Sequence, residues 1–198
     1  MRLFSFALAL ALLAPSAASA QQFFDFDGQA TGYTTVGDVV TMVAVVGDPG
    51  VDTPLPLDFA SFQYTIVVES LDVDLISGNT TGLVTGTIAL YEDDGTPADF
   101  ADASTFTDGT ALLTGEVESL AITQFTATLG SGSGLVDWTG GSRISDFRPS
   151  DRENWAFVVN TSPATASGYD HRWDGKVEPQ EPVVDTEVRS WGGVKIGY

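Results

Sequence analysis

The sequence has no cysteine, one histidine and few basic residues, and each shortage excludes a class of chemistry. Among its 198 residues, 27 are Asp or Glu and 8 are Lys or Arg, so the formal net charge at pH 7 is −19. Without cysteine the chain has no disulfides, thiolate nucleophiles, zinc–thiolate sites or cysteine-ligated iron–sulfur clusters. A single imidazole excludes a two-histidine metal site and the H-E-x-x-H metalloprotease motif within one chain.

The basic residues are also unevenly distributed. Residues 21–142 contain 18 acidic residues and neither lysine nor arginine, and seven of the eight basic residues follow position 142. Nucleic acids and anionic lipids both require a positive protein surface, so neither is expected as a partner. The acidity favours bound cations, and simple solubility in a saline setting is the competing explanation.

The first twenty residues have the pattern of a bacterial secretory signal. Arg2 supplies the positive charge, residues 3–13 are apolar, and Ala18-Ser19-Ala20 provides small residues before the expected cleavage site. The apolar run is too short for a membrane span, which needs about 20 residues, and no later stretch is long and apolar enough to cross as a helix. We predict that residues 1–20 are removed and that the mature chain is exported, to the extracellular space, the cell surface or the periplasm.

The dominant period of the remaining sequence is two, which is typical of half-buried strands. With 43% hydrophobic residues the chain can bury a core, and turn signals rich in glycine and aspartate separate the alternating runs. The expected strands are 33–46, 59–76, 80–91, 110–118, 120–129, 134–138, 154–160, 168–173 and 176–178, with Asp174-Gly175 as the turn of the last hairpin. This pattern predicts an all-β fold, a single antiparallel β-sandwich of the jelly-roll or immunoglobulin-like kind, over residues 21–177.

The composition changes after the predicted domain. Residues 178–188 hold two prolines and four acidic residues, which predicts a stiff, extended linker. The following segment, 189–198, is apolar and contains Trp191, Lys195 and Tyr198. We expect it to be a docking segment or, alternatively, an edge strand of the same domain.

The same alternation is also compatible with a small outer-membrane β-barrel. The mature length suits about eight strands, and the sequence ends in an alternating run that finishes on Tyr198. Threonine and glycine occupy positions where a lipid-facing band is needed, and the proline-containing linker interrupts the last hairpin. We therefore keep the barrel only as a minor alternative.

Two stretches resemble a family of secreted proteins. The sequences D-G-T-A-L-L-T-G at 108–115 and G-S-G-S-G-L-V-D-W-T-G-G at 130–141 are similar to strand-and-turn motifs of secreted bacterial β-sandwich proteins that carry a Pro-Glu-Pro sorting tail. The resemblance implies a surface or matrix component. The chain departs from that family because it has no apolar membrane segment followed by a basic cluster. Its ending from Trp191 to Lys195 is similar to the Trp-Gly-x-x-Lys termini of other exported bacterial proteins, which implies sorting or attachment.

Carboxylates clustered at turns are the candidate ligands for a calcium ion, because calcium prefers hard oxygen ligands and loops of β-sandwiches offer them. Two groups stand out in the sequence: Glu92, Asp93 and Asp94 in one turn, and Asp25 and Asp27 near the start of the mature chain. Neither group has the spacing of a twelve-residue calcium loop, so solvated turn charges are the competing interpretation.

Tryptophans are the candidate contacts for a sugar ring. Trp155 alternates with Phe157 and Val159 and is predicted to lie in the core. Trp138 and Trp173 lie next to turns with polar neighbours, and we predict that both are exposed and bind a ligand. Exposed tryptophans beside polar groups would favour a carbohydrate-binding module.

No set of residues points clearly to catalysis. His171 lies beside Asp170, but the run G-S-G-S-G places Gly132 where a nucleophile elbow needs serine, so His171 is interpreted as a strand residue. Paired carboxylates, such as Asp72 and Asp74, arise by chance in so acidic a chain. The sequence therefore favours an exported, non-enzymatic surface, matrix or adhesion component. A carbohydrate-binding module is the alternative, and a glycoside-active enzyme is a weaker one.

Overall fold

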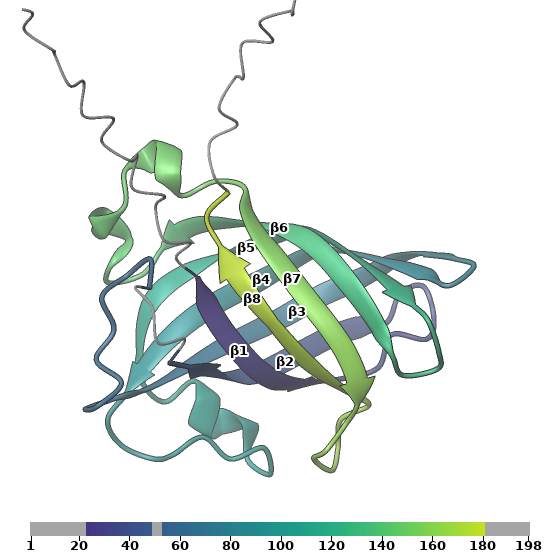
Figure 1. Ribbon diagram of the computed structural model, residues 1–198, viewed down its shortest axis with the longest axis horizontal. Coiled ribbons are helices and arrows are strands. Elements are labelled where there is room, and N and C mark those ends of the chain that lie inside the picture. Colours follow the sequence, from purple (N-terminus) through teal and green to yellow (C-terminus); the bar gives the residue numbers. More distant parts are fainter. Residues whose placement is uncertain (1–22, 49–52, 181–198) are drawn as a thin grey trace, which may run out of the picture.

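The computed structural model describes residues 23–48 and 53–180, and its strands form a closed antiparallel barrel. Each strand pairs with its neighbours in sequence, and the last pairs with the first (Figure 1). The eight strands are β1 (Phe24–Ala30), β2 (Val39–Gly47), β3 (Gln63–Ser77), β4 (Thr80–Asp93), β5 (Thr110–Gln124), β6 (Gly130–Gly140), β7 (Trp155–Pro163) and β8 (His171–Glu178). The described helices are three short 3-10 turns, η1 (Ala103–Phe106), η2 (Ile144–Asp146) and η3 (Pro149–Asp151). Across the described ranges, no helix has the length and apolar character needed to cross a membrane.

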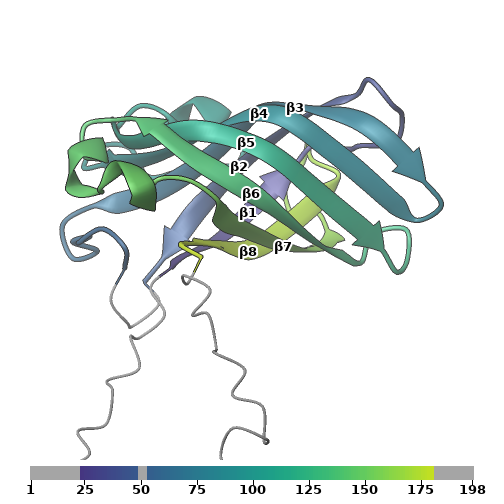
Figure 2. The ribbon, with the colours of Figure 1, turned by 90° about the horizontal axis from the view of Figure 1, so that it is seen from above.

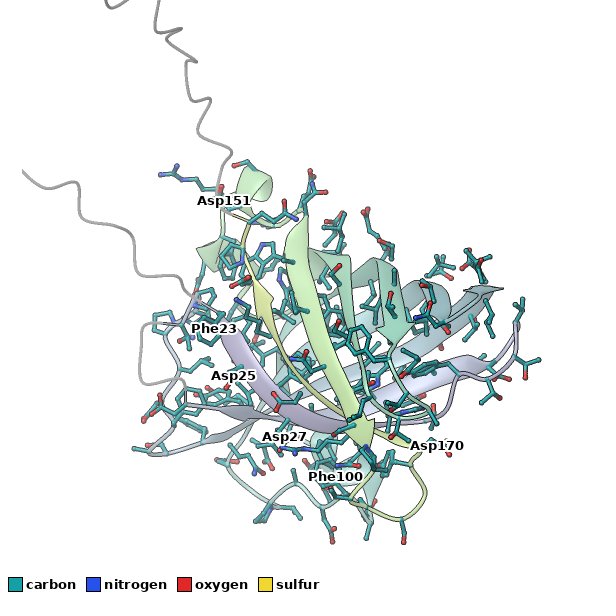
Figure 3. The ribbon with its side chains drawn as sticks, turned by 45° about the vertical axis from the view of Figure 1, so that its right-hand side comes forward. Phe23, Asp25, Asp27, Phe100, Asp151 and Asp170 are labelled. Atoms are coloured by element: carbon teal, nitrogen blue, oxygen red, sulfur yellow. The ribbon has the colours of Figure 1, made fainter. Side chains whose placement is uncertain are left out.

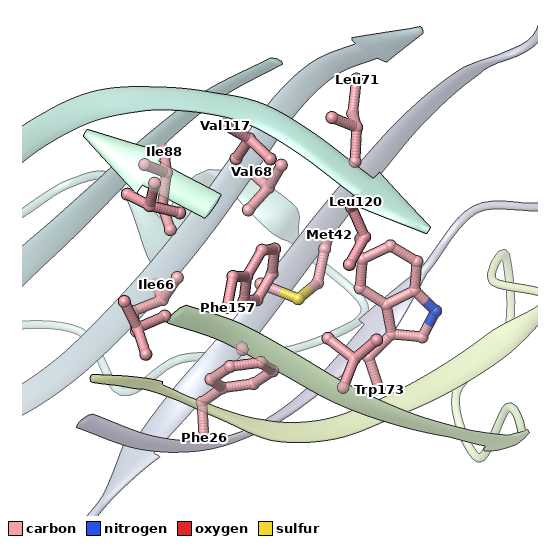
Figure 4. Close-up of a cluster of buried hydrophobic side chains, with 14 of the residues drawn as sticks. Phe26, Met42, Ile66, Val68, Leu71, Ile88, Val117, Leu120, Phe157 and Trp173 are labelled. Atoms are coloured by element: carbon pink, nitrogen blue, oxygen red, sulfur yellow. The ribbon is translucent and has the colours of Figure 1, made fainter. Parts of the chain in front are cut away.

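The period-two pattern sorts side chains between the inside and the outside of the barrel. In β1, Phe24 and Phe26 are buried, while Asp25 and Asp27 are exposed. Burial of apolar side chains on the inside supplies most of the free energy that holds such a barrel together. The close-up in Figure 4 shows side chains from several strands converging on the interior, among them Phe26, Met42, Ile66, Phe157 and Trp173.

The interior is filled by aromatic and aliphatic side chains, as the width of an eight-stranded barrel allows. The Phe24 and Trp155 rings stack with centroids 6.0 Å apart, and Trp138 meets Trp155 edge-on at 5.9 Å. Glycine provides the necessary space at a crowded point of β8. A Cβ atom at Gly175 would overlap the Val158 carbonyl oxygen and lie 3.0 Å from the Phe26 ring.

The all-β class is confirmed, but the predicted β-sandwich is wrong, because the sheet closes on itself. Closure requires β1, which the sequence prediction missed, and an unbroken β8, which it divided at Asp174-Gly175. Both of these residues lie within β8: Asp174 pairs with Asp27, and Gly175 pairs with Phe26. The expected strands 110–118 and 120–129 are likewise mostly one strand, β5, with a register shift between Val117 and Ser119.

The wall of the barrel carries charged and hydroxyl side chains on its outside. On β1 and β8 the outward side chains include Asp25, Asp27, Arg172, Asp174 and Lys176, and an ion pair joins Asp27 to Arg172 at 2.6 Å. Barrels that span a membrane instead face the lipid with an apolar band. The minor alternative is confirmed as far as the small barrel is concerned, because β1 to β8 close into one sheet.

One part of the outer wall is apolar, and it is covered. Val43 and Val67 point outward from β2 and β3 but are buried under Phe106 of η1. The Thr65 hydroxyl donates a hydrogen bond to the Phe106 carbonyl at 2.7 Å, which fixes the connection between β4 and β5 on the wall.

The crowding at Gly175 predicts that Gly175→Ala destabilises the barrel by about 2 kcal/mol, because an added methyl group meets backbone and an aromatic ring. Gly47→Ala is the matched control, since the nearest atom to its new Cβ is Asp25 Oδ2 at 3.9 Å. Urea unfolding of residues 21–198 measures both variants, and equal stabilities would contradict the packing described here.

Candidate functional site

The two ends of the barrel differ in their exposed side chains. The Tyr33 end is where β1 ends and β8 begins, and it carries the connections β1–β2, β3–β4, β5–β6 and β7–β8. The Trp155 end is the opposite end, where β1 begins and β8 ends. Figure 2 shows the hairpin of β3 and β4 extending beyond the wall at the Tyr33 end.

Exposed large hydrophobic side chains gather at the Tyr33 end. All six that occur in the described residues lie there, with exposed fractions from 38% for Ile76 to 68% for Phe125. Backbone and side-chain hydrogen bonds join the segments that carry them: the Gly37 amide donates to the Val73 carbonyl at 2.8 Å, and the Asn79 side chain donates to the Gln124 carbonyl at 2.8 Å. We call this set the apolar arc; its members are Val36, Val39, Leu75, Ile76, Phe125 and Leu129.

Carboxylates flank the apolar arc, and basic residues are absent from its segments. Asp38 lies between two members of the arc in sequence, Asp72 pairs with Val39, and Asp74 precedes Leu75. Backbone N–H groups of Thr35 and Thr34 donate to Asp38, which lowers the pKa of this carboxyl and keeps it charged. The connections 31–38, 125–129 and 164–170 contain no lysine or arginine. The arc is therefore an apolar surface in a negative field.

Beneath the arc, the Tyr33 side chain closes the barrel. It is 5% exposed, and its ring stacks on His171 with centroids 4.7 Å apart. Gln124 Nε2 donates a hydrogen bond to the Tyr33 hydroxyl at 2.6 Å, so a residue of the β1–β2 connection is held by the end of β5. Burial raises the pKa of Tyr33 to about 12, which keeps the phenol neutral at physiological pH.

Three buried polar atoms around Tyr33 lack a hydrogen-bond partner. Among the described residues a fourth buried atom, Trp138 Nε1 on β6, also lacks one. The three are Gln124 Oε1, His171 Nδ1 and Trp173 Nε1. The Trp173 N–H lies close to the Tyr33 hydroxyl and partly opposes the rise in the pKa of Tyr33. The Trp173 N–H does not, however, form a hydrogen bond of normal geometry. Buried polar groups without partners are costly, so this cluster favours water or a ligand that supplies hydrogen bonds.

A hollow of about 490 Å³ lies over this cluster, lined by His171, Asp38, Asp170, Thr34 and Gly32 among others. Asp170 holds one side of it, because its Oδ2 atom accepts a hydrogen bond from the Gly32 amide at 2.7 Å. We use the name Tyr33 cluster for the group under this hollow: Tyr33, Gln124, His171 and Trp173.

The Trp155 end has a hollow of its own, of about 530 Å³, but its chemistry differs. Its lining includes Phe147, Trp155, Asp151 and Glu153. The connection between β6 and β7 carries three arginines, Arg143, Arg148 and Arg152, together with three carboxylates, and Arg143 pairs with Asp146 at 2.6 Å. Figure 3 shows Asp151 at this end and Asp170 at the other.

The predicted exposure of Trp138 and Trp173 is wrong. Trp138 is 2% exposed and Trp173 is fully buried, because β6 and β8 continue through the positions that resembled turns. The prediction that Trp155 lies in the core is confirmed, with 1% of the residue exposed. Binding of a ligand by Trp138 or Trp173 stays a prediction, and only Trp173 belongs to the Tyr33 cluster.

The structure does not bring the predicted calcium ligands together. Asp25 and Asp27 lie on the outside of β1 (Figure 3), and the strands β2 and β3 separate them from the turn at the end of β4. Glu92 accepts a hydrogen bond from the Tyr64 hydroxyl at 2.9 Å, and Asp93 accepts one from the Gly95 amide at 2.7 Å. Within the part of the chain that the structure describes, no three histidine or acidic side chains are placed to hold a metal ion. Calcium binding thus stays a prediction from the sequence.

The remaining predicted residues lie outside the described ranges. These are the docking residues Trp191, Lys195 and Tyr198, the signal segment 1–20 and most of the linker 178–188. Glu178 itself is the last residue of β8, so the barrel extends one residue into the predicted linker.

Sequence reasoning did not identify Tyr33, Gln124 or the apolar arc. Tyr33 was predicted to begin a strand, and the arc residues are dispersed between positions 36 and 129. The available signal was the presence of large apolar residues such as Phe125 and Leu129 within a turn, where polar residues are expected.

The environment of His171 predicts a pH-dependent stability. Burial lowers the pKa of His171 from 6.5, and the nearby Asp170 only partly opposes this shift. The imidazole of the unfolded chain therefore binds a proton more readily than that of the folded chain. The contribution of neutral His171 to the free energy of unfolding is complete above about pH 6.5 and is lost as the pH falls below that value. We expect NMR titration to give an imidazole pKa below 6.5, and His171→Gln to reduce the fall in Tm between about pH 7.5 and 5.5. An imidazole that titrates at or above 6.5 would contradict this environment.

No protein-family model, curated protein or solved structure matches the chain.

Proposed function

We propose that this chain is an exported, non-enzymatic surface component that binds a partner through the Tyr33 end of its barrel. The observation that carries the proposal is the apolar arc, in which all six exposed large hydrophobic side chains of the described residues gather at one end. Single exposed apolar side chains are ordinary on a protein surface, whereas a group of this kind at one end is typical of a contact surface.

The rest of the barrel supports this proposal as a rigid scaffold. Its interior is occupied by packed side chains such as Phe26, Phe157 and Trp173, and its wall carries charged residues. A closed sheet also leaves no unpaired strand edge for another chain to join. A partner must therefore contact side chains rather than pair with a strand.

The charges around the arc indicate the chemistry of the partner. Asp38, Asp72 and Asp74 lie beside apolar side chains, with no basic residue in the neighbouring connections. A complementary surface combines apolar side chains with lysine or arginine. We expect a protein partner of that kind at the cell surface or in the extracellular matrix.

This proposal predicts that the arc retains the chain at the cell surface. The double variant Leu75→Ser, Phe125→Ser removes two exposed members of the arc, and we expect it to shift from the cell-surface fraction into the medium by about tenfold. The matched control is Leu135→Ser, which removes an apolar side chain from the wall of β6. Immunoblots of fractionated producing cells measure the distribution of each form.

Two results of that experiment would overturn the proposal. One is equal retention of the arc variant and the wild-type chain. The other is a wild-type chain that stays inside the cell, which would contradict export. Melting temperatures of the purified variants establish that the barrels are folded.

Carbohydrate binding at the Tyr33 cluster is the second candidate function. The unpartnered atoms include an obligatory donor, Trp173 Nε1, and an acceptor, Gln124 Oε1, and His171 lines the hollow above them. Sugar hydroxyls both donate and accept hydrogen bonds, so they match this mixed set.

A panel of neutral oligosaccharides tests the second candidate by calorimetry and tryptophan fluorescence. If an oligosaccharide binds, His171→Ala should weaken the affinity for it by about tenfold, because the hydrogen bond between the sugar and the His171 imidazole is lost. Trp138→Phe is the control, since Trp138 lies outside the Tyr33 cluster. Binding that is unaffected by His171→Ala, or absent across the panel, would rule against this function.

A further inference from the structure

The segment 189–198 has the chemistry that the apolar arc requires. Its sequence is R-S-W-G-G-V-K-I-G-Y, which contains two basic residues, Arg189 and Lys195, and no acidic residue. Four of its side chains are large and apolar: Trp191, Val194, Ile196 and Tyr198. An apolar segment with a positive charge complements an apolar surface with a negative one.

The barrel cannot take up this segment as another strand. Every described strand pairs on both sides, and β8 already pairs with β7 and with β1. The edge-strand interpretation therefore has no open edge available in the described barrel. Binding to this protein must instead use side chains, and the exposed large hydrophobic side chains of the described residues lie at the Tyr33 end.

Exposed apolar surface favours the Tyr33 end over the Trp155 end. The hollow at the Trp155 end is lined by Asp146, Asp151 and Glu153, and the same connection carries Arg143, Arg148 and Arg152, so its charges of both signs largely offset one another. Its Trp155 is also almost completely covered, so little aromatic surface is offered there. The Tyr33 end offers exposed apolar side chains, acidic neighbours and connections without lysine or arginine.

Chain connectivity favours the arc of a second copy over the arc of the same copy. The strand β8 ends at Glu178, at the end of the barrel opposite the arc. The ten residues 179–188 cover at most roughly 35 Å when fully extended. By comparison β3 covers roughly 40 Å from Gln63 at the Trp155 end to Leu75 in the arc, so docking within one copy would need the linker to be almost fully extended.

We propose that the segment 189–198 of one copy docks on the apolar arc of the next copy. Its apolar side chains contact Val39, Leu75 and Phe125, and its two basic side chains lie near Asp38 and Asp74. Because donor and acceptor surfaces are different and lie at opposite ends, the contact is heterologous and repeats as a linear, head-to-tail chain. This inference rests on the proposed function of the arc as a contact surface, and it names a second copy as the partner.

Sedimentation velocity of residues 21–198 over a range of concentrations tests the proposal. We expect the weight-average mass to rise by about twofold or more with concentration, and molar salt to weaken the assembly. Three variants should each abolish this rise in mass with concentration. They are the deletion of 189–198, the single variant Trp191→Ala, and the double variant Leu75→Asp with Phe125→Asp. Leu135→Asp, on the wall of β6, is the matched control and should assemble as the wild-type chain does.

Mixing two defective forms provides the sharper test. The deletion of 189–198 retains an intact arc, and the double variant Leu75→Asp, Phe125→Asp retains the segment. Each should be monomeric alone, and an equimolar mixture should form a one-to-one complex that does not grow further, because only one productive contact remains. Melting temperatures show whether each form is folded.

Three outcomes would overturn the proposal. They are a wild-type chain that stays monomeric at all concentrations, oligomers that persist after deletion of 189–198, and no complex in the mixture. A monomeric wild-type chain together with loss of the arc variant from the cell surface would reject head-to-tail assembly and retain the arc as a contact surface for another protein. Failure of both experiments would reject the arc itself.

Discussion

The pairing of β1 with β8 is the constraint on which the rest of this structure depends. The two strands are in register from Phe24 opposite Val177 to Ala30 opposite His171, and this pairing closes the barrel. Closure defines an inside and an outside for every strand, so one alternating pattern gives both a packed interior and a charged wall. It also builds the Tyr33 cluster: the Asp170 amide donates to the Ala30 carbonyl at 3.0 Å, which brings the start of β8 against the connection that carries Tyr33.

The sequence predicted most of the strands but not the pair that closes them. Local alternation is clear in β3 and β4, and both were expected nearly at their observed bounds. In β1 the pattern is interrupted by Gly28 and Gln29, and in β8 the dipeptide Asp174-Gly175 has the sequence of a hairpin turn. Gly175 is there for another reason, since the Phe26 ring occupies the space beside it. Tertiary crowding and a local turn signal favour the same residue, so sequence alone could not separate them.

The candidate site was less predictable than the fold, for a related reason. Trp138 and Trp173 have polar sequence neighbours, but in a strand adjacent residues face opposite sides, so polar neighbours are compatible with burial. The members of the apolar arc are far apart in sequence and come together only because the connections of an up-and-down barrel alternate between its two ends. An antiparallel sandwich with another strand order would have separated them. The topology, rather than any single motif, assembles this surface.

The two ends of the barrel differ in exposed apolar surface rather than in the sign of their charge. The β6–β7 connection at the Trp155 end carries three arginines and three carboxylates, and the connections at the Tyr33 end carry carboxylates without basic residues. Copies placed side by side would oppose acidic walls, which is unfavourable, and two Tyr33 ends placed together would oppose Asp38 and Asp74 with their own equivalents. A contact between the arc and the segment 189–198, which carries Arg189 and Lys195 and no acidic residue, avoids both repulsions. A directional arrangement of this barrel is therefore favoured over a symmetric one, because the exposed large apolar side chains of the described residues lie at one end and the basic segment follows the strand that ends at the other.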